Sequence, residues 1–190
     1  LAKELGERAH FATANLSDPE SVDNLVNAAE TAAGSPLDIL VANAGITKDG
    51  LLMRMKDEDF EQVLKVNLES YFRLSRAAVK GMMKRRAGRI IGVTSVVGVT
   101  GNPGQTNYAA SKAGVHKLTE ALSDELKADG VTVNAVLPSI IDTPTNRADM
   151  PKADFAAWVS PQDLAAAILF LASEEARAIT GALLPVTGRV

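Results

Sequence analysis

The chain has 190 residues, of which 46% are hydrophobic and 23% are charged, a composition typical of a globular domain and not of a disordered segment. Its formal net charge of −3 at pH 7 argues against nucleic acid as a main partner, because phosphate binding needs a basic surface. The absence of cysteine excludes disulfides and thiolate chemistry and fits the cytoplasmic location that we expect. The longest apolar run, Ala165 to Ala172, is too short to cross a membrane.

Segments typical of strands and of helices alternate along the chain. Residues 1–5, which end at Gly6, fit the last part of a helix. Short apolar runs predict strands at residues 9–14, 37–41, 89–94, 132–137 and 182–186. Start signals and apolar residues at helical spacing predict helices that begin at Ser17, about Asp57, about Thr106 and Pro161.

This alternation predicts the fold class. Apolar strands that alternate with helices form a parallel sheet covered on both faces, the doubly wound α/β or Rossmann-like arrangement. No linker or repeat interrupts the pattern, so we expect residues 1–190 to form a single domain. Ligands of such sheets bind beyond the carboxyl ends of the strands. The residues to consider therefore follow the expected strands: Asn15, Asn43 to Gly45, Ser95, and Pro138 to Thr143.

Tyr108 and Lys112 are the first candidates for chemistry. They are four residues apart in an expected helix and therefore share one face. A lysine ammonium roughly 4 Å from a phenol favours the phenolate by up to about 4 kcal/mol at an effective dielectric near 20. Such a shift from the ordinary pKa of about 10 would suit general acid–base catalysis. Ser95, at the end of the preceding strand, could hold a carbonyl oxygen beside the phenol, and Asn67 places an amide between two apolar residues of a long helical pattern.

Each of these residues also has an ordinary structural explanation. Tyr-x-x-x-Lys pairs are common on solvated helix faces, Ser95 could simply end a strand, and Asn67 could be a satisfied buried amide. Gly45 could only supply a positive φ angle in a turn. The catalytic interpretation is favoured because all of them fall, in one order, at strand ends or on the flanking helices.

Taken together, these motifs resemble the short-chain dehydrogenase/reductase family. The resemblance rests on Asn43-Ala44-Gly45, Asn67, Ser95, Tyr108-x-x-x-Lys112 and Pro138, with the family's spacing from Ser95 to Tyr108, and it covers essentially the whole chain. Within the family, residues 44–49, 52–55, 95–98 and 101–105 are similar to the 3-oxoacyl-[acyl-carrier-protein] reductases of fatty acid biosynthesis.

The resemblance implies a role for each residue. Tyr108 would be the general acid in reduction and the general base in oxidation. Lys112 would lower the pKa of Tyr108 and hold the nicotinamide ribose, Ser95 would orient the substrate oxygen, and Asn67 would position a water in the proton relay. The other cofactor-binding positions would be Asn15 facing adenine, Asn43, Ala44 and Gly45 at the adenosine ribose, Pro138, and Ile141 and Thr143 at the nicotinamide carboxamide.

The resemblance also implies the cofactor and the assembly. The protein would transfer a hydride between a nicotinamide cofactor and a carbonyl or alcohol, with NADP(H) expected before NAD(H), and would form a homotetramer. The family's Thr-Gly-x-x-x-Gly-x-Gly turn does not occur in the sequence. We therefore expect the strand–helix–strand unit that carries this turn to be absent from these 190 residues, and cofactor binding to be weak without it.

Smaller departures bear on the substrate. Arg86 matches one of two arginines with which the reductases dock acyl carrier protein, but Asp129 occupies the other position, and the reversed charge makes a carrier-protein partner doubtful. The segment of residues 143–160, which would form the substrate lid, is shorter than the lid of those reductases. Ser139 replaces a glycine after Pro138 and would be strained if that position needs a positive φ angle.

Three functions stay open on the sequence. The first is a reductase of a 3-oxoacyl thioester, and the second is a dehydrogenase or reductase of another small carbonyl compound. The third is a non-catalytic fragment that folds and oligomerises. A metal enzyme is not expected, because His10 and His116 are isolated in the sequence.

Overall fold

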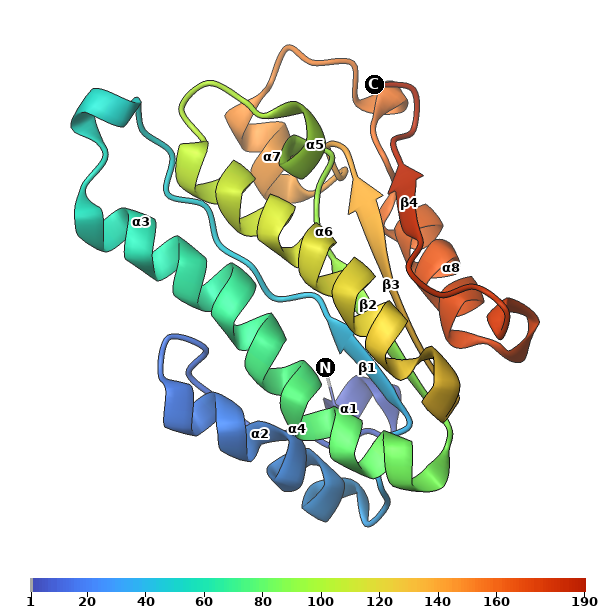
Figure 1. Cartoon of the computed structure of the whole chain (residues 1–190). Coiled ribbons are helices and arrows are strands. Elements are labelled where there is room, and N and C mark those ends of the chain that lie inside the picture. Colours follow the sequence, from blue (N-terminus) through green and yellow to red (C-terminus); the bar gives the residue numbers. More distant parts are fainter. Residues whose placement is uncertain (1) are drawn as a thin grey trace.

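A four-stranded parallel sheet lies at the centre of the computed structural model, which describes residues 2–190 (Figure 1). The strands are β1 (Ile39–Ala42), β2 (Gly88–Val93), β3 (Val131–Pro138) and β4 (Leu183–Val186), and they lie side by side in this order. Each neighbouring pair is parallel. The predicted doubly wound α/β class is confirmed.

Helices cover both faces of this sheet. On one face, α4 (Ser70–Arg85) packs on β1 and β2, and α6 (Thr106–Leu126) packs on β3, while α2 (Pro19–Ala33) lies against α4. On the other face, α8 (Pro161–Ala172) contacts β2, β3 and β4 (Figure 1). The shorter helices are α1 (Ala2–Leu5), α3 (Asp57–Leu64), α5 (Val97–Thr100) and α7 (Pro144–Asp149). None of the helices among residues 2–190 is long and apolar enough to span a membrane.

The core has two halves because strand side chains point alternately to opposite faces. Ile90 and Ile91 are neighbours in β2 and both are fully buried, but they belong to different clusters. Ile90 packs with Met82 of α4 on one face, and Ile91 packs with Leu171 of α8 on the other. Burial of each such side chain stabilises the fold by about 1.5–3 kcal/mol.

Two expectations for the early part of the chain are wrong. The apolar run at residues 37–41 implied a strand buried on both faces, but Ile39 and Val41 of β1 remain 43% and 40% exposed, because α8, the helix on the other face, packs on β2, β3 and β4. Residues 9–14 form no strand, since no described strand lies beside them to accept their backbone hydrogen bonds. The expected helix end before Gly6 is confirmed as α1, although Leu1 lies outside the described residues.

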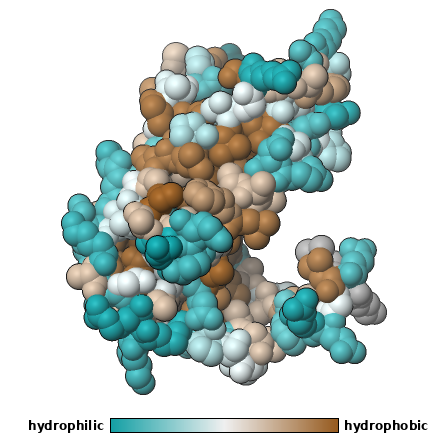
Figure 2. Space-filling view, turned by 90° about the vertical axis from the view of Figure 1, so that its right-hand side faces the viewer, coloured by the Kyte–Doolittle hydropathy of each residue, from teal (hydrophilic) through white to brown (hydrophobic). Residues whose placement is uncertain are grey.

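One side of the molecule keeps a hydrophobic surface. Figure 2 shows a hollow on this side whose wall is largely hydrophobic. Large apolar side chains are exposed on both β1 and α8, namely Ile39, Val41, Leu169 and Phe170.

A close backbone approach joins the end of α4 to the start of β3. Gly130 has a φ angle of +74°, and a Cβ atom at this position would lie 2.3 Å from the carbonyl oxygen of Arg86. Gly34, after α2, has a similar φ angle of +67°, but a Cβ atom there would meet nothing within 4 Å. The two glycines therefore separate the cost of a left-handed backbone from the cost of a steric clash.

We expect Gly130→Ala to destabilise the protein more than Gly34→Ala. The left-handed backbone alone should cost each variant about 1–2 kcal/mol, and the clash with the Arg86 carbonyl should bring the Gly130→Ala loss to about 3 kcal/mol or more. Urea denaturation of both variants measures the two free energies of unfolding. Equal losses of unfolding free energy in the two variants would show that the backbone at Arg86 moves away from the new Cβ atom without an energetic penalty.

Candidate active site

A cavity of about 290 Å³ opens at the carboxyl ends of β1, β2 and β3. Ser95 follows β2, Pro138 ends β3, and Tyr108 and Lys112 reach the cavity from α6. This edge of a parallel sheet is where ligands of doubly wound folds bind. The structure thus brings three predicted catalytic residues into one cavity.

Lys112 is the buried cation of the site. Its side chain is only 4% exposed, and its Nζ donates a hydrogen bond of 2.9 Å to the carbonyl oxygen of Val93 at the end of β2. The same Nζ lies 5.6 Å from the centre of the Tyr108 ring. Burial lowers the pKa of Lys112 to about 8, because the folded protein solvates the ammonium less well than water does.

The pKa of Tyr108 moves opposite to the expected direction. Burial raises it, the Ser95 hydroxyl works against this increase, and the negative charge of Asp49 adds to it. The net change is thus opposite to the lowering expected from Lys112, whose ammonium donates to Val93 and is not among the groups that shift this pKa. Tyr108 is therefore a protonated phenol at neutral pH.

Ser95 is fixed by the packing of the turn that follows it. Its Oγ accepts a hydrogen bond from the backbone N–H of Val97, at 3.2 Å. A Cβ atom on Gly98 would lie 2.6 Å from the His116 ring and 2.9 Å from the backbone of Lys112, so only glycine lets this turn rest on α6. His116, one of the two isolated histidines, is buried and shares a hydrogen bond of 2.9 Å with Thr94.

Asn67 lies in a π-helical turn, residues 65–69, between α3 and α4. π-Helical turns inside helices are frequent at functional sites. Its Oδ1 accepts from the N–H of Ile46 at 2.8 Å, and its Nδ2 donates to the Ile46 carbonyl at 3.0 Å and to Ser111 Oγ at 3.1 Å. Both amide hydrogens are thus engaged by the protein, and the Asn67 side chain can contact a water only through Oδ1.

Gly45 permits a close approach of the segment after β1. A Cβ atom on it would lie 3.4 Å from both Asn67 Oδ1 and Lys112 Nζ. Its predicted neighbours Asn43 and Ala44 are exposed, and of these two only Asn43 lines the active-site cavity.

Of the remaining predicted cofactor-binding residues, only some line the active-site cavity. Pro138 and Ile141 line the active-site cavity. The hydroxyl of Thr143 accepts from the N–H of Asn146 and caps α7. Asn15 does not line this cavity, and its side chain accepts from the N–H of Ser17 in the turn before α2.

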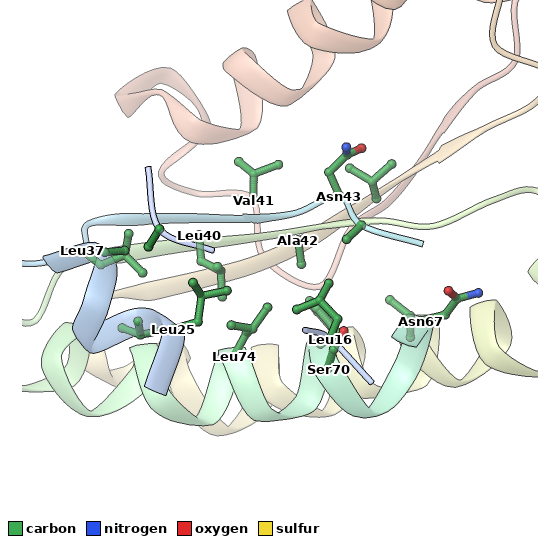
Figure 3. A pocket seen from close by; sticks show the side chains of 17 residues that line it. Leu16, Leu25, Leu37, Leu40, Val41, Ala42, Asn43, Asn67, Ser70 and Leu74 are labelled. Atoms are coloured by element: carbon green, nitrogen blue, oxygen red, sulfur yellow. The ribbon is translucent and has the colours of Figure 1, made fainter. Parts of the chain in front are cut away.

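A second cavity, of about 350 Å³, adjoins the first along β1, and Asn43 lines both. Figure 3 shows Leu25, Leu40 and Leu74 pointing into it from α2, β1 and α4, while Val41 points to the other face of the strand. No charged residue is among those that line it. Its lining suits an apolar group better than a phosphate.

Six residues that line the cavity were not predicted as catalytic or cofactor-binding residues, namely Ile46, Thr47, Val93, Thr94, Ser139 and Asn146. Asn146 of α7 and Ser139 both line the active-site cavity. Ser139 was noted among the residues that follow the strands and as a departure from the family, and its backbone is not strained, since Arg86 is the only described non-glycine residue with a positive φ angle. Its hydroxyl instead donates to the carbonyl oxygen of Thr187 at 2.8 Å. A polar residue three positions after the Thr143-Pro144 helix start could have indicated Asn146.

Comparison with known proteins gives one family and a consistent group of relatives. The family model described as short chain dehydrogenase matches residues 1–154. A 3-oxoacyl-[acyl-carrier-protein] reductase FabG of Vibrio harveyi is 45% identical over 201 residues, covering 99% of this chain and 80% of the relative. The proteins of the same name from Vibrio cholerae and Rickettsia conorii are 46% and 43% identical, covering 97% and 99% of this chain and 78% and 79% of theirs.

The buried Lys112 should make stability depend on pH in a defined window. Between about pH 8 and 10.5 the folded protein has released the Lys112 proton and the unfolded chain still holds it, so the free energy of unfolding rises with pH there. Below this window the lowered pKa corresponds to a cost of about 3 kcal/mol. Lys112→Met should therefore be more stable than the wild type at pH 7, and the difference should shrink toward pH 10.

Urea denaturation at pH 7 and at pH 10 measures this difference. Lys117→Met, which removes an exposed lysine of the same helix, is the matched control and should show little dependence on pH. A Lys112→Met difference that is the same at both pH values would contradict the shifted pKa.

Proposed function

The chain belongs to the short-chain dehydrogenase family, and we propose that it reduces the keto group of a 3-oxoacyl thioester, with Tyr108 as the proton donor. Like its family, it is an oxidoreductase that transfers a hydride between a nicotinamide cofactor and a carbonyl or alcohol. The observation that carries the proposal is the meeting of Tyr108, Ser95 and the buried Lys112 in one cavity at the carboxyl edge of the sheet.

The residues present fit the nicotinamide half of such a cofactor. The cavity offers a buried ammonium at Lys112, a glycine at position 45 that leaves room beside it, and the Pro138 and Ile141 walls. In our proposal Lys112 holds the ribose hydroxyls and Asn43 and Gly45 border the adenosine side, with NADP(H) preferred over NAD(H) by resemblance to the reductases. A bound reduced nicotinamide supplies the hydride.

The protein side chains handle the oxygen and its proton. Ser95 donates a hydrogen bond to the substrate carbonyl oxygen and holds it beside the Tyr108 phenol. As negative charge develops on this oxygen, Tyr108 gives it the phenolic proton, and the phenolate that remains has the Lys112 ammonium 5.6 Å from its ring centre. Asn67 acts by holding the Ile46 backbone against α6, through the three hydrogen bonds of its amide.

The direction of the reaction follows from the same electrostatics. Burial and Asp49 raise the pKa of Tyr108, which keeps the phenol protonated at neutral pH. Reduction needs a protonated donor, whereas oxidation needs the phenolate as base. The site is therefore set for reduction near neutral pH, and oxidation would be favoured only in alkaline solution.

The carrier of the acyl group is a separate question. Arg86 donates a hydrogen bond of 2.7 Å to the Ala128 carbonyl and lies 3.9 Å from the Asp129 carboxylate. Both residues precede the starts of strands and so lie at the sheet edge opposite the cavity. A basic docking site for an acidic carrier protein is thus partly neutralised here, and we propose that a small thioester such as an acyl-coenzyme A is accepted at least as well.

We also propose a homotetramer built on α3, α4 and α6. An apolar groove of about 550 Å³ runs between these helices, and its lining residue Phe72 is 43% exposed. Exposed apolar grooves of this kind are frequent at subunit interfaces.

Tyr108→Phe should abolish turnover while Tyr71→Phe should not. Loss of the proton donor is expected to lower kcat for acetoacetyl-coenzyme A by about 10²–10⁴-fold. Tyr71, the other tyrosine of the chain, is buried and shares a hydrogen bond of 3.1 Å with Thr119. Its removal should cost about 1 kcal/mol of stability and leave kcat unchanged. Retention of most turnover by Tyr108→Phe would refute the mechanism, and a preference for free ketones over the thioester would favour the small-carbonyl alternative.

Asp129→Arg should raise kcat/KM for carrier-protein substrates and not for coenzyme A substrates. Restoring the second basic residue beside Arg86 is expected to raise kcat/KM for an acetoacetyl carrier protein by about tenfold, the effect of one favourable charge pair. The value for acetoacetyl-coenzyme A should not change. Glu175→Arg, which reverses a charge on an exposed residue elsewhere, controls for net charge. If the wild type already prefers the carrier-protein thioester strongly and Asp129→Arg has no effect, the Arg86–Asp129 argument fails.

A further inference from the structure

Residues 142–158, here called the lid, leave the sheet after β3 and return beside their starting point. Asp142 N–H donates to the Val159 carbonyl at 2.8 Å, and Val159 N–H donates to the Ile140 carbonyl at 3.0 Å. These hydrogen bonds close the base of the lid, and on its returning half the Arg189 N–H donates to the Ala157 carbonyl at 2.8 Å. The lid begins with α7, which contributes Asn146 to the wall of the active-site cavity.

Arg147 joins the two halves of the lid. Its Nε and Nη2 donate to the two carboxylate oxygens of Asp142 at 2.5 and 2.7 Å, the bidentate geometry in which arginine binds a carboxylate most strongly. Its guanidinium carbon also lies 4.7 Å from the centre of the Phe155 ring. One side chain thus connects the first residue of the lid to its returning half.

Phe155 extends this connection into the buried part of the protein. Its ring packs against Trp158 with the centroids 4.8 Å apart, and Trp158 is only 8% exposed. Asp142, Arg147, Phe155 and Trp158 therefore form a continuous series of contacts across the lid.

The neighbour of Arg147 faces the cavity. The Asn146 side chain donates to the Ile141 carbonyl at 2.8 Å and lines the cavity with Ile141. Because the two residues are adjacent in one short helix, the contacts that hold Arg147 also set where Asn146 stands.

We propose that Arg147 is a positioning residue, which holds the lid over the active-site cavity through Asp142 and Phe155 and thereby sets substrate affinity. The kinetic part of this inference rests on the proposed reduction, whereas the closure of the lid rests on the contacts alone. Arg147 does not bind the substrate itself, since its guanidinium is already paired with Asp142 and stacked on Phe155.

The chain contains a matched control for this residue. Arg76 of α4 also pairs with an aspartate, Asp23, at 3.1 Å and also lies over an aromatic ring, that of Phe72, at 5.1 Å. Arg147→Gln and Arg76→Gln therefore remove the same two kinds of contact, at the lid and away from it.

Limited proteolysis tests the lid without any need for activity. Trypsin can cut after Lys152, an exposed residue of the lid, and we expect this cut to be about tenfold faster in Arg147→Gln, the effect of one weak ion pair and one cation–π contact. Arg76→Gln should be cut at the wild-type rate. Emission of Trp158, the single tryptophan of the chain, should shift in Arg147→Gln alone. Unchanged cleavage and emission in Arg147→Gln would overturn the proposal.

Kinetics then separate positioning from chemistry. Arg147→Gln should raise KM for acetoacetyl-coenzyme A by about tenfold and leave kcat within about twofold, because the lid is argued to act on binding. Arg147→Lys, which keeps the charge beside Asp142, should recover part of the affinity. A loss of kcat at constant KM would contradict the proposal. If the wild type shows no turnover, the proposed function fails while the proteolysis result still decides the role of Arg147.

Discussion

The placement of Lys112 is the constraint on which the active site depends. Its ammonium is buried between α6 and the end of β2 and donates to the Val93 carbonyl. An ammonium in this position costs folding energy, as its lowered pKa indicates. The hydrogen bond also fixes α6 against β2, so that Tyr108, one turn earlier on the same face, stands next to Ser95. A destabilising residue thus stands where it aligns the groups that react in the proposed mechanism.

Around this lysine, the backbone is brought close by residues with little or no side chain. Gly45 brings the segment after β1 next to Lys112 and Asn67, and Gly98 lets the turn after Ser95 rest on the backbone of Lys112. Asn67 then fixes the Ile46 backbone with its whole amide group. Each of these contacts involves the backbone. The geometry of the site is therefore set by how closely the segment after β1 and the turn after Ser95 can approach α6.

The sequence predicted the features that depend on local periodicity. The α/β class, the Tyr108–Lys112 face and the position of Ser95 all follow from residue spacing within one element or at its end. The features that depend on distant neighbours could not be predicted. Residues 9–14 have strand-like composition but no described partner strand, and the pKa of Tyr108 rises chiefly because the fold buries its phenol, which no spacing reveals. Asn146 was missed because its place depends on the contacts of the lid.

This contrast divides the site into two parts with different tolerance to change. Tyr108 and Lys112 stand on α6 and Ser95 follows β2, whose positions are held by the buried core, and in the proposed mechanism these residues supply the proton chemistry. Asn146 and Ile141 stand on or beside the lid, which is held by partly exposed contacts such as Arg147–Asp142, each weak by itself. Substitutions in the lid can therefore alter which carbonyl compound fits without disturbing the proton donor. The lid belongs to this second part, whereas the Arg86–Asp129 pair lies at the opposite edge of the sheet and could affect only the carrier of the acyl group.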